Sequence, residues 1–311
     1  DLHSFPTRRS SDLIKTPIPI IQGGMAVRIS TAQLAAAVAN EGGIGIIAGT
    51  GMTIKELVEE IRKARSMTNG ILGVNVLFAV RNFADLVMAA IEEGIDLIIS
   101  GAGFSRDMFS WGKKSNTPIM PIVSSAKLAV LAEKLGAAAV VVEGKEAGGH
   151  LGTDRPTKDI LIEVIKSIKI PAIAAGGIIS GQDIAEMIKL GASGVQMGTI
   201  FAASEESNAS IEMKELYVKS KKEDIVIVKS PVGLPGLALK NNFYNLLVKN
   251  SLPNIDACSG CLKRCNKNFC IMKALLNACK TGNPEEALVF AGEKAYKIKE
   301  ILPVKTIFKN L

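Results

Sequence analysis

Short apolar runs alternate with longer amphipathic segments from residue 17 to about residue 205. The runs consist mostly of Val, Ile and Ala, without a polar residue at every second position. This continuous pattern is typical of strands buried on both faces, as in a parallel sheet covered by helices. It predicts eight strands: Ile18–Gln22, Ile44–Ala48, Gly73–Leu77, Leu97–Ser100, Ile119–Val123, Ala139–Glu143, Ala172–Ala175 and Gly194–Met197.

Between these strands, apolar residues recur at the spacing of one helix face. Ser30 is the expected N-cap of the first helix, and Thr53 directly precedes the second. Gly94 and Gly136 follow two helix ends, where glycine is the common residue. The predicted helices are Thr31–Asn40, Ile54–Arg65, Asn82–Glu93, Ala126–Leu135, Pro156–Ile168 and Gly181–Leu190.

Eight strand–helix steps at a spacing of roughly 20–30 residues predict an α/β fold, the (β/α)8 or TIM barrel. A doubly wound parallel sheet is the alternative, although it normally has fewer strands and a glycine-rich turn after the first. We expect the barrel core, with its cofactor site, to span residues 14–210.

The pattern changes after residue 205. Ile211–Lys219 is a predicted helix, Ile225–Val228 a short strand, and Ser230–Gly236 a rigid turn containing two prolines. The tail from about Asn241 has a helical pattern and contains all five cysteines. Residues 211–311 are therefore expected to form a mainly helical, cysteine-containing cap that packs on the barrel.

The first thirteen residues have neither the hydrophobic periodicity of the rest nor the apolar core of a secretory signal. We interpret residues 1–13 as a non-native N-terminal scar. His3 lies in this segment, so His150 is the one histidine expected in the folded part.

Bulk composition narrows the function classes. The chain has 311 residues, 48% of them hydrophobic, and a mean hydropathy of +0.27. No stretch of about 18 uncharged apolar residues occurs, so we expect a cytoplasmic protein without a membrane span. The net charge is +7, but the lysines are scattered and form no basic arm, which argues against nucleic-acid binding. The charge does suit attraction of anionic substrates or cofactors.

Glycine is concentrated where the last two predicted strands end. Gly176 and Gly177 precede Ser180 and a helix, and Gly198 and Thr199 end the eighth strand. In barrels these two loops commonly bind phosphate, because glycine lets backbone N–H groups approach the oxygens closely. Tight turns without a ligand are the alternative explanation.

His150 follows Gly148 and Gly149 after the sixth predicted strand, at the catalytic end of the barrel. An imidazole titrates near neutrality and can act as a base or bind an anion. A purely structural histidine is the alternative. The sequence contains no Rossmann fingerprint, no P-loop and no Gly-x-Ser-x-Gly motif, and a single histidine excludes a metal site of two histidines and a carboxylate.

Five segments together resemble the nitronate monooxygenase (2-nitropropane dioxygenase) family, which includes the flavin-type enoyl-acyl-carrier-protein reductases. In order they are PIIQGGMA, GVNV, VVEGKEAGGHLG, IPAIAAGG and GVQMGT. The resemblance runs from about Thr16 to Leu311 and implies FMN bound at the carboxyl end of the barrel. By motif match it assigns catalysis to His150.

The resemblance also implies a set of cofactor-binding residues. Those beside the flavin ring would be Gly23, Gly24, Met25, Asn75, Glu143, Gly148 and Gly149, and those at the phosphate end would be Gly176, Gly177, Gln196, Met197, Gly198 and Thr199. The segment Ile200–Asn208 departs from the family, whose members often have Arg and then an acidic-Cys-Asp run there.

Three activities remain open. The leading expectation is an FMN-dependent nitronate monooxygenase that uses O2 to convert alkyl nitronates into carbonyl compounds and nitrite. The alternative is an NAD(P)H-dependent FMN reductase of enoyl thioesters or quinones, which Glu143 favours because many nitronate monooxygenases have Gln there. A redox-sensing flavoprotein that uses the cysteine cap is the third. The oligomeric state stays open, with a homodimer as one option.

Four cysteines lie within thirteen residues in the spacing C-x2-C-x3-C-x4-C, and Cys279 follows. They are Cys258, Cys261, Cys265 and Cys270. Such density suits zinc or an iron–sulfur cluster, although the spacing matches no standard ferredoxin. Reduced thiols that pack a helical cap are the alternative, and we expect no disulfides.

Overall fold

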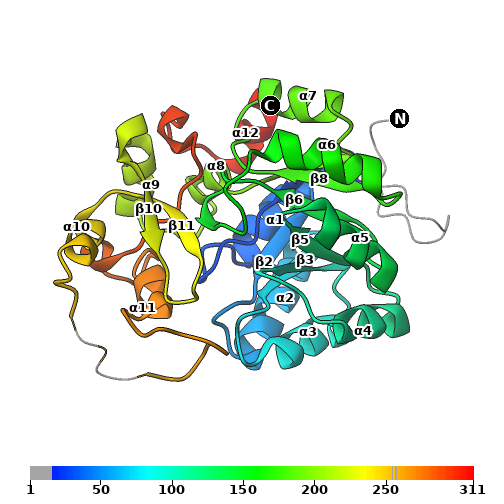
Figure 1. The fold of residues 1–311 in the computed structure, drawn as a ribbon, viewed down its shortest axis with the longest axis horizontal. Coiled ribbons are helices and arrows are strands. Elements are labelled where there is room, and N and C mark those ends of the chain that lie inside the picture. The colour runs from blue at the N-terminus through cyan, green and yellow to red at the C-terminus, as the bar shows by residue number, and fades with distance from the viewer. Residues whose placement is uncertain (1–15, 254, 256–257) are drawn as a thin grey trace.

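A computed structural model describes residues 16–253, 255 and 258–311. The segment interpreted as an N-terminal scar lies outside these residues. In the described part, eight parallel strands alternate with helices and form one sheet (Figure 1). The strands are β1 (Ile20–Gln22), β2 (Gly45–Ala48), β3 (Leu72–Leu77), β4 (Leu97–Gly101), β5 (Ile119–Val123), β6 (Val140–Glu143), β8 (Ala172–Ala175) and β9 (Gly194–Met197).

The sheet closes on itself. Its strands follow the order β1-β9-β8-β6-β5-β4-β3-β2, and Ile21 pairs in parallel with Ile44 beside β2. The backbone N–H of Gln22 donates to the carbonyl of Ile44 over 3.0 Å, and the N–H of Ile44 donates to that of Ile20 over 2.9 Å. The predicted TIM barrel is therefore confirmed, and the doubly wound alternative is wrong because that sheet has two open edges.

Branched apolar side chains fill the barrel interior, as they do in other barrels of this class. This inner cluster is separate from the layer between strands and helices. Its buried members are Ile21, Ile44, Ile46, Leu97, Ile99, Met120, Ala139, Val141, Ile173 and Ala175.

Helices surround the strands on the outside. They are α1 (Ala32–Asn40), α2 (Ile54–Met67), α3 (Phe83–Glu92), α4 (Asp107–Ser115), α5 (Ala126–Leu135), α6 (Thr157–Ser167), α7 (Gly181–Lys189) and α8 (Thr199–Ala202). The six predicted helices are present with ends shifted by at most two residues. Helix α4 was not predicted, since Gly112 in its interior is a poor helix former.

At the start of α2 the structure has Thr53 as the N-cap residue, whereas the expected N-cap of α1 is wrong. Thr53 forms a capping box with Glu56, whose N–H donates to the Thr53 hydroxyl over 3.2 Å. Ser30 is not the cap of α1, because Thr31 occupies that position. The Ser30 hydroxyl instead accepts the Met25 N–H over 3.0 Å and so shapes the loop between β1 and α1.

Residues after the barrel strands form an extension on its carboxyl end (Figure 1). It contains α9 (Ile211–Lys219), α10 (Asn242–Val248), α11 (Ile271–Leu276), α12 (Val304–Asn310), and the 3-10 turns η1 (Lys222–Asp224), η2 (Pro284–Glu286) and η3 (Ala295–Lys297). A three-stranded antiparallel sheet joins β10 (Ile225–Lys229), β11 (Pro235–Leu239) and β7 (Gly149–His150). Strand β11 was not predicted, because its first residues were assigned to the turn.

The last helix, α12, returns to the barrel and packs against α1. The ring of Phe308 on α12 lies 5.9 Å from that of Phe201 on α8. The extension therefore supplies an outer helix of the barrel as well as a cover for one of its ends.

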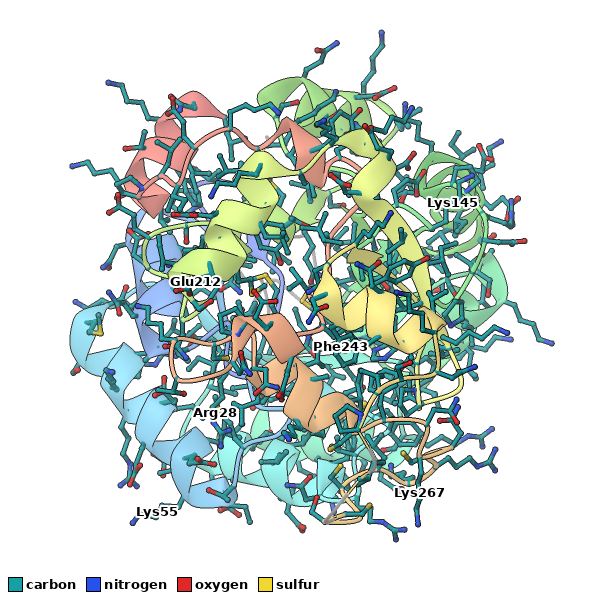
Figure 2. The ribbon with its side chains drawn as sticks, turned by 90° about the vertical axis from the view of Figure 1, so that its left-hand side faces the viewer. Arg28, Lys55, Lys145, Glu212, Phe243 and Lys267 are labelled. Carbon is teal, nitrogen blue, oxygen red and sulfur yellow. The ribbon has the colours of Figure 1, made fainter. Side chains whose placement is uncertain are left out.

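Figure 2 looks onto the extension, with Phe243 of α10 over the middle of the face. Lys55, Lys145 and Lys267 project outward from separate places around it, which agrees with the scattered basic residues of the sequence. Within the described ranges, no helix combines the length and the apolar character needed to cross a bilayer.

The contact between β2 and α1 gives a test of the fold. A Cβ atom on Gly45 would lie 1.8 Å from the main-chain oxygen of Ala35, whereas one on Gly101 would meet no atom closer than 3.5 Å. We expect Gly45→Ala to lower the free energy of unfolding by about 3 kcal/mol, as overpacking against backbone does. Urea denaturation would measure this, with Gly101→Ala as the matched strand control. Equal effects of the two substitutions would contradict the packing described here.

Candidate functional site

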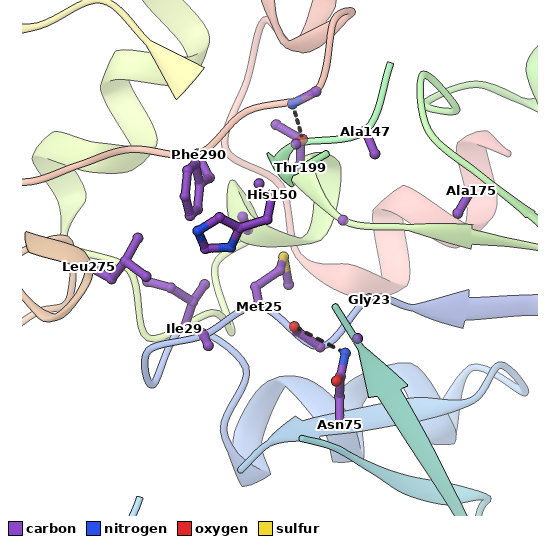
Figure 3. A pocket seen from close by; sticks show the side chains of 18 of the residues that line it. Gly23, Met25, Ile29, Asn75, Ala147, His150, Ala175, Thr199, Leu275 and Phe290 are labelled. Atoms are coloured by element: carbon purple, nitrogen blue, oxygen red, sulfur yellow. Dashed lines mark hydrogen bonds between the residues drawn. The ribbon is translucent and has the colours of Figure 1, made fainter. Parts of the chain in front are cut away.

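A cavity of about 230 Å³ opens at the carboxyl end of the barrel, and all eight barrel strands or the loops after them contribute to its lining. The structure brings nearly all the predicted site residues together there (Figure 3). Those that line the cavity are Gly23, Gly24, Met25, Asn75, Glu143, Gly148, Gly149, His150, Gly176, Gly177, Gln196, Gly198 and Thr199.

Met197 is placed differently from the other predicted residues. Its side chain is buried in the apolar layer between strands and helices, because it points to the outer face of β9. Its carbonyl accepts the Gly23 N–H over 2.8 Å. Met197 thus holds the loop after β1 through its backbone carbonyl, and it is absent from the cavity lining.

The loop after β1 is held by a buried polar network. The Gln22 side-chain oxygen accepts the Ile46 N–H over 3.0 Å, and its amide nitrogen donates to the Ser30 hydroxyl over 2.8 Å. Asn75 on β3 approaches the carbonyl of Gly24, with 3.5 Å between the two atoms. The network presents the backbone of residues 23–25 to the cavity.

His150 lies on β7, whose two residues pair with Gly236 and Leu237 of β11. Its Nε2 atom is 2.7 Å from the Ser230 hydroxyl, and its ring meets that of Phe290 edge to face with 5.1 Å between centroids. Burial lowers the pKa of His150 to about 4. The imidazole is therefore uncharged at neutral pH and can offer a ring N–H as a hydrogen-bond donor.

The partners of His150 come from the extension, and the sequence analysis did not identify them. Ser230 begins a turn in which its N–H donates to the Leu234 carbonyl over 3.2 Å. Phe290 is positioned by the buried Tyr217, whose hydroxyl donates to the Phe290 carbonyl over 2.7 Å. The predicted rigid turn at residues 230–236 was the one available signal, and it gave no indication of which residue it would contact.

Glu143 ends β6 and lines the same cavity. Burial raises its pKa to about 7, so the carboxyl is close to half protonated at neutral pH. Among the residues that the structure describes, none donates a hydrogen bond to it. Burial thus weakens the charge of both Glu143 and His150.

The lining combines an unpartnered buried polar atom with two walls at which only glycine fits. Gln196 is 8% exposed, and its side-chain oxygen has no hydrogen-bond partner in the described part of the chain. A hydrogen-bond donor from a ligand or from a water molecule would satisfy this acceptor. A Cβ atom on Gly24 would lie 2.3 Å from Cβ of Asn75, and one on Gly148 would lie 2.7 Å from the backbone of Ala291, so only glycine fits at both walls.

The extension supplies an apolar wall opposite the barrel. Side chains from α9 and α11, together with the segments beside them, line this part of the cavity. They are Met213, Leu262, Ile271, Met272, Leu275 and Leu288.

The cysteine-bearing segment forms part of that wall. Leu262 faces the cavity, and Lys263 beside it lies over the ring of Phe78 with 3.6 Å between Nζ and the centroid. Cys270 directly precedes α11. Within residues 16–253, 255 and 258–311, no three His, Cys, Asp or Glu side chains are grouped as metal ligands. The alternatives of a metal site and of packed thiols stay open.

The closed parallel barrel, with its cavity at the carboxyl ends of the strands, has the architecture of a TIM-barrel enzyme. The sequence model described as nitronate monooxygenase matches residues 7–311, and the chain belongs to this family.

Individual relatives carry different names. The chain is 30% identical to an octahydro-indene-carboxyl-CoA dehydrogenase of Mycobacterium tuberculosis over 78% of this chain and 68% of that one. It is 31% identical to a probable nitronate monooxygenase of Staphylococcus aureus, over 76% and 79% of the two chains. The structure of FabK from Thermotoga maritima superposes with a TM-score of 0.87, with 34% identity over 98% of this chain and 94% of that one. Monooxygenases and dehydrogenases are oxidoreductases, and so is this enzyme.

The raised pKa of Glu143 predicts a pH dependence of stability. Between pH 4.5 and about 7, the folded protein retains a proton that the unfolded chain has lost. The free energy of unfolding contributed by this group is therefore fully present below pH 4.5 and decreases as the pH rises through about 7. Glu143→Gln cannot lose that proton.

We expect the stability of Glu143→Gln relative to the parent protein to increase across this window, measured by urea denaturation at several pH values. Glu300→Gln, at an exposed glutamate, is the control. The lowered pKa of His150 makes its own contribution to the free energy of unfolding increase with pH. Because His150 is present in all three proteins, this contribution cancels in the comparison. A parallel pH profile for Glu143→Gln and the parent would show that burial does not raise this pKa.

Proposed function

We propose that the enzyme binds FMN at the carboxyl end of the barrel and reduces an enoyl thioester with electrons from NAD(P)H. The observation that carries this proposal is the uncharged surroundings of His150. Its imidazole is neutral at pH 7, burial raises the pKa of Glu143 in the same lining to about 7, and the facing wall is apolar. An uncharged substrate with an apolar tail matches such a cavity better than an anion does.

The lining residues fit FMN. Gly23, Gly24 and Met25 would lie along the flavin ring, with Asn75 beside it, and the unpartnered oxygen of Gln196 would accept a hydrogen bond from the cofactor. The backbone around Gly176, Gly177, Gly198 and Thr199 would hold the phosphate. When bound, FMN supplies the capacity to take up a hydride from NAD(P)H and to deliver it to one carbon of a double bond, while the other carbon would take up a proton that comes ultimately from solvent.

The chain itself positions and polarises the substrate. His150 would donate its ring N–H to the thioester carbonyl oxygen, which draws electron density from the conjugated double bond. Ser230 and Phe290 hold the imidazole in place for this contact. Met272 and Leu275 would pack against the acyl chain and exclude water from the double bond.

One relative supports a thioester as the substrate class, and one solved structure shows how much of the chain the similarity covers. The Mycobacterium tuberculosis dehydrogenase acts on a carboxyl-CoA, which its name states. The similarity to FabK extends over 98% of this chain, including the extension that builds the apolar wall.

Oxidation of a nitronate or nitroalkane by O2 is the second candidate. The relatives named probable nitronate monooxygenase favour it, together with the single histidine that faces a glycine-lined cavity. In this reaction the His150 N–H would bind a nitro oxygen, or the imidazole would act as a base toward a neutral nitroalkane.

The two candidates are separated by mixing the flavin-loaded protein anaerobically with NADH, NADPH or propyl-2-nitronate and following flavin absorbance. We expect NADH or NADPH to bleach the flavin rapidly and crotonyl-CoA to restore its colour. Reduction by the nitronate alone would replace the thioester proposal with the monooxygenase. No reduction by any of the three would contradict both.

Substitution of His150 tests its catalytic contact. We expect His150→Ala to retain the flavin and to lower kcat by about a hundredfold or more, as loss of one hydrogen-bond donor to a developing negative charge on oxygen does. Ser230→Ala should lower kcat less, since the imidazole remains but is less well oriented. Steady-state rates and the flavin-to-protein absorbance ratio measure both effects. Unchanged turnover in His150→Ala would exclude this role.

A further inference from the structure

The phosphate end of the cavity is built largely from glycine, yet a phosphate monoester carries between one and two negative charges. Lysine and arginine are represented in the described lining by one residue, Lys294 of the extension. We propose that Lys294 is the counter-charge for the phosphate of the bound flavin. This inference rests on the proposed function and adds a residue that is far from every barrel motif in the sequence.

Lys294 lies close to the glycines of the phosphate end. Its Cε atom is 3.9 Å from the position that a Cβ atom on Gly177 would occupy. The lysine stem thus passes beside the open backbone of that glycine. A phosphate bound to the N–H groups of this loop would be within reach of the ammonium group.

The backbone before Lys294 is tied to the barrel at two points. The Gly292 N–H donates to the Thr199 hydroxyl over 2.9 Å, the bond drawn dashed at the top of Figure 3. The Glu293 N–H donates to the Glu146 carbonyl over 2.9 Å. Since Thr199 begins α8 and Glu146 lies in the loop after β6, these bonds hold the segment to two separate parts of the barrel and determine the position from which Lys294 enters the cavity.

Asp183 of α7 orients the Lys294 side chain through an ion pair between its Oδ1 atom and the ammonium group. The other oxygen, Oδ2, accepts the N–H groups of Ile179 and Ser180, each over 3.1 Å. The Asp183 side chain is 13% exposed and that of Lys294 is 32% exposed. The carboxylate is therefore fixed in the helix cap and can hold the lysine without reaching the ligand itself.

The ion pair leaves Lys294 able to bind an anion. An ammonium group has three hydrogen-bond donors, and one is directed at Asp183. The remaining two are available to phosphate oxygens. Asp183 is thus a positioning residue, and Lys294 is the group that contacts the ligand.

The proposal predicts that a change at Lys294 affects the affinity for FMN and leaves that for riboflavin nearly unchanged, because riboflavin has the same ring and no phosphate. In the full-length protein freed of flavin, we expect Lys294→Gln to weaken FMN binding about tenfold, the loss of one charge-assisted contact. Riboflavin affinity should change by less than about twofold. Flavin fluorescence titration measures both dissociation constants without any turnover.

Two further variants complete the experiment. Lys294→Arg should recover most of the FMN affinity because it retains the charge, and Lys297→Gln, at an exposed lysine of the same segment, should bind both flavins like the parent. Equal weakening of FMN and riboflavin by Lys294→Gln, or no weakening of either, would overturn the assignment of Lys294. Failure of the parent protein to bind FMN would instead overturn the proposed function.

Discussion

The pairing of β7 with β11 is the contact on which the site depends. Only two residues of the loop after β6, Gly149 and His150, join this sheet, and they do so with strand residues more than 80 positions later. The pairing fixes the backbone of His150 and brings the loop under the extension. Ser230 and Phe290 then meet the imidazole from two sides. Without this sheet, His150 would lie on a glycine-rich loop with no partner to orient it.

Charge is distributed unevenly along the cavity. Near His150 and Glu143, burial shifts both pKa values toward the neutral forms. Beside Gly177, Lys294 forms an ion pair with a carboxylate that is fixed in a helix cap. A ligand with one anionic end and one uncharged, aromatic end would match this gradient. The same gradient orients such a ligand before any specific contact forms, because an inverted ligand would place its anion in the apolar region.

The barrel could be predicted closely from the sequence because parallel strands buried on both faces leave a continuous apolar signal. Glycines at strand ends likewise indicated Gly176, Gly177 and His150 by local pattern alone. The partners of these residues carry no such signal. Phe290 and Lys294 follow the barrel by almost a hundred residues, and their positions result from tertiary contacts such as the Tyr217 hydrogen bond. Met197 belongs to the matched motif, yet its side chain lies in the outer apolar layer, because a motif match does not show which face of a strand a residue occupies.

The return of α12 to α1 has a consequence for cooperativity. Helix α1 packs on β2 and α2 within the barrel, and α12 adds a contact that comes from the extension. Because these segments are far apart in the sequence, their contact couples the extension to the barrel. Local opening of α12 therefore exposes apolar surface on both parts, and the cover of the cavity shares the stability of the barrel that it closes.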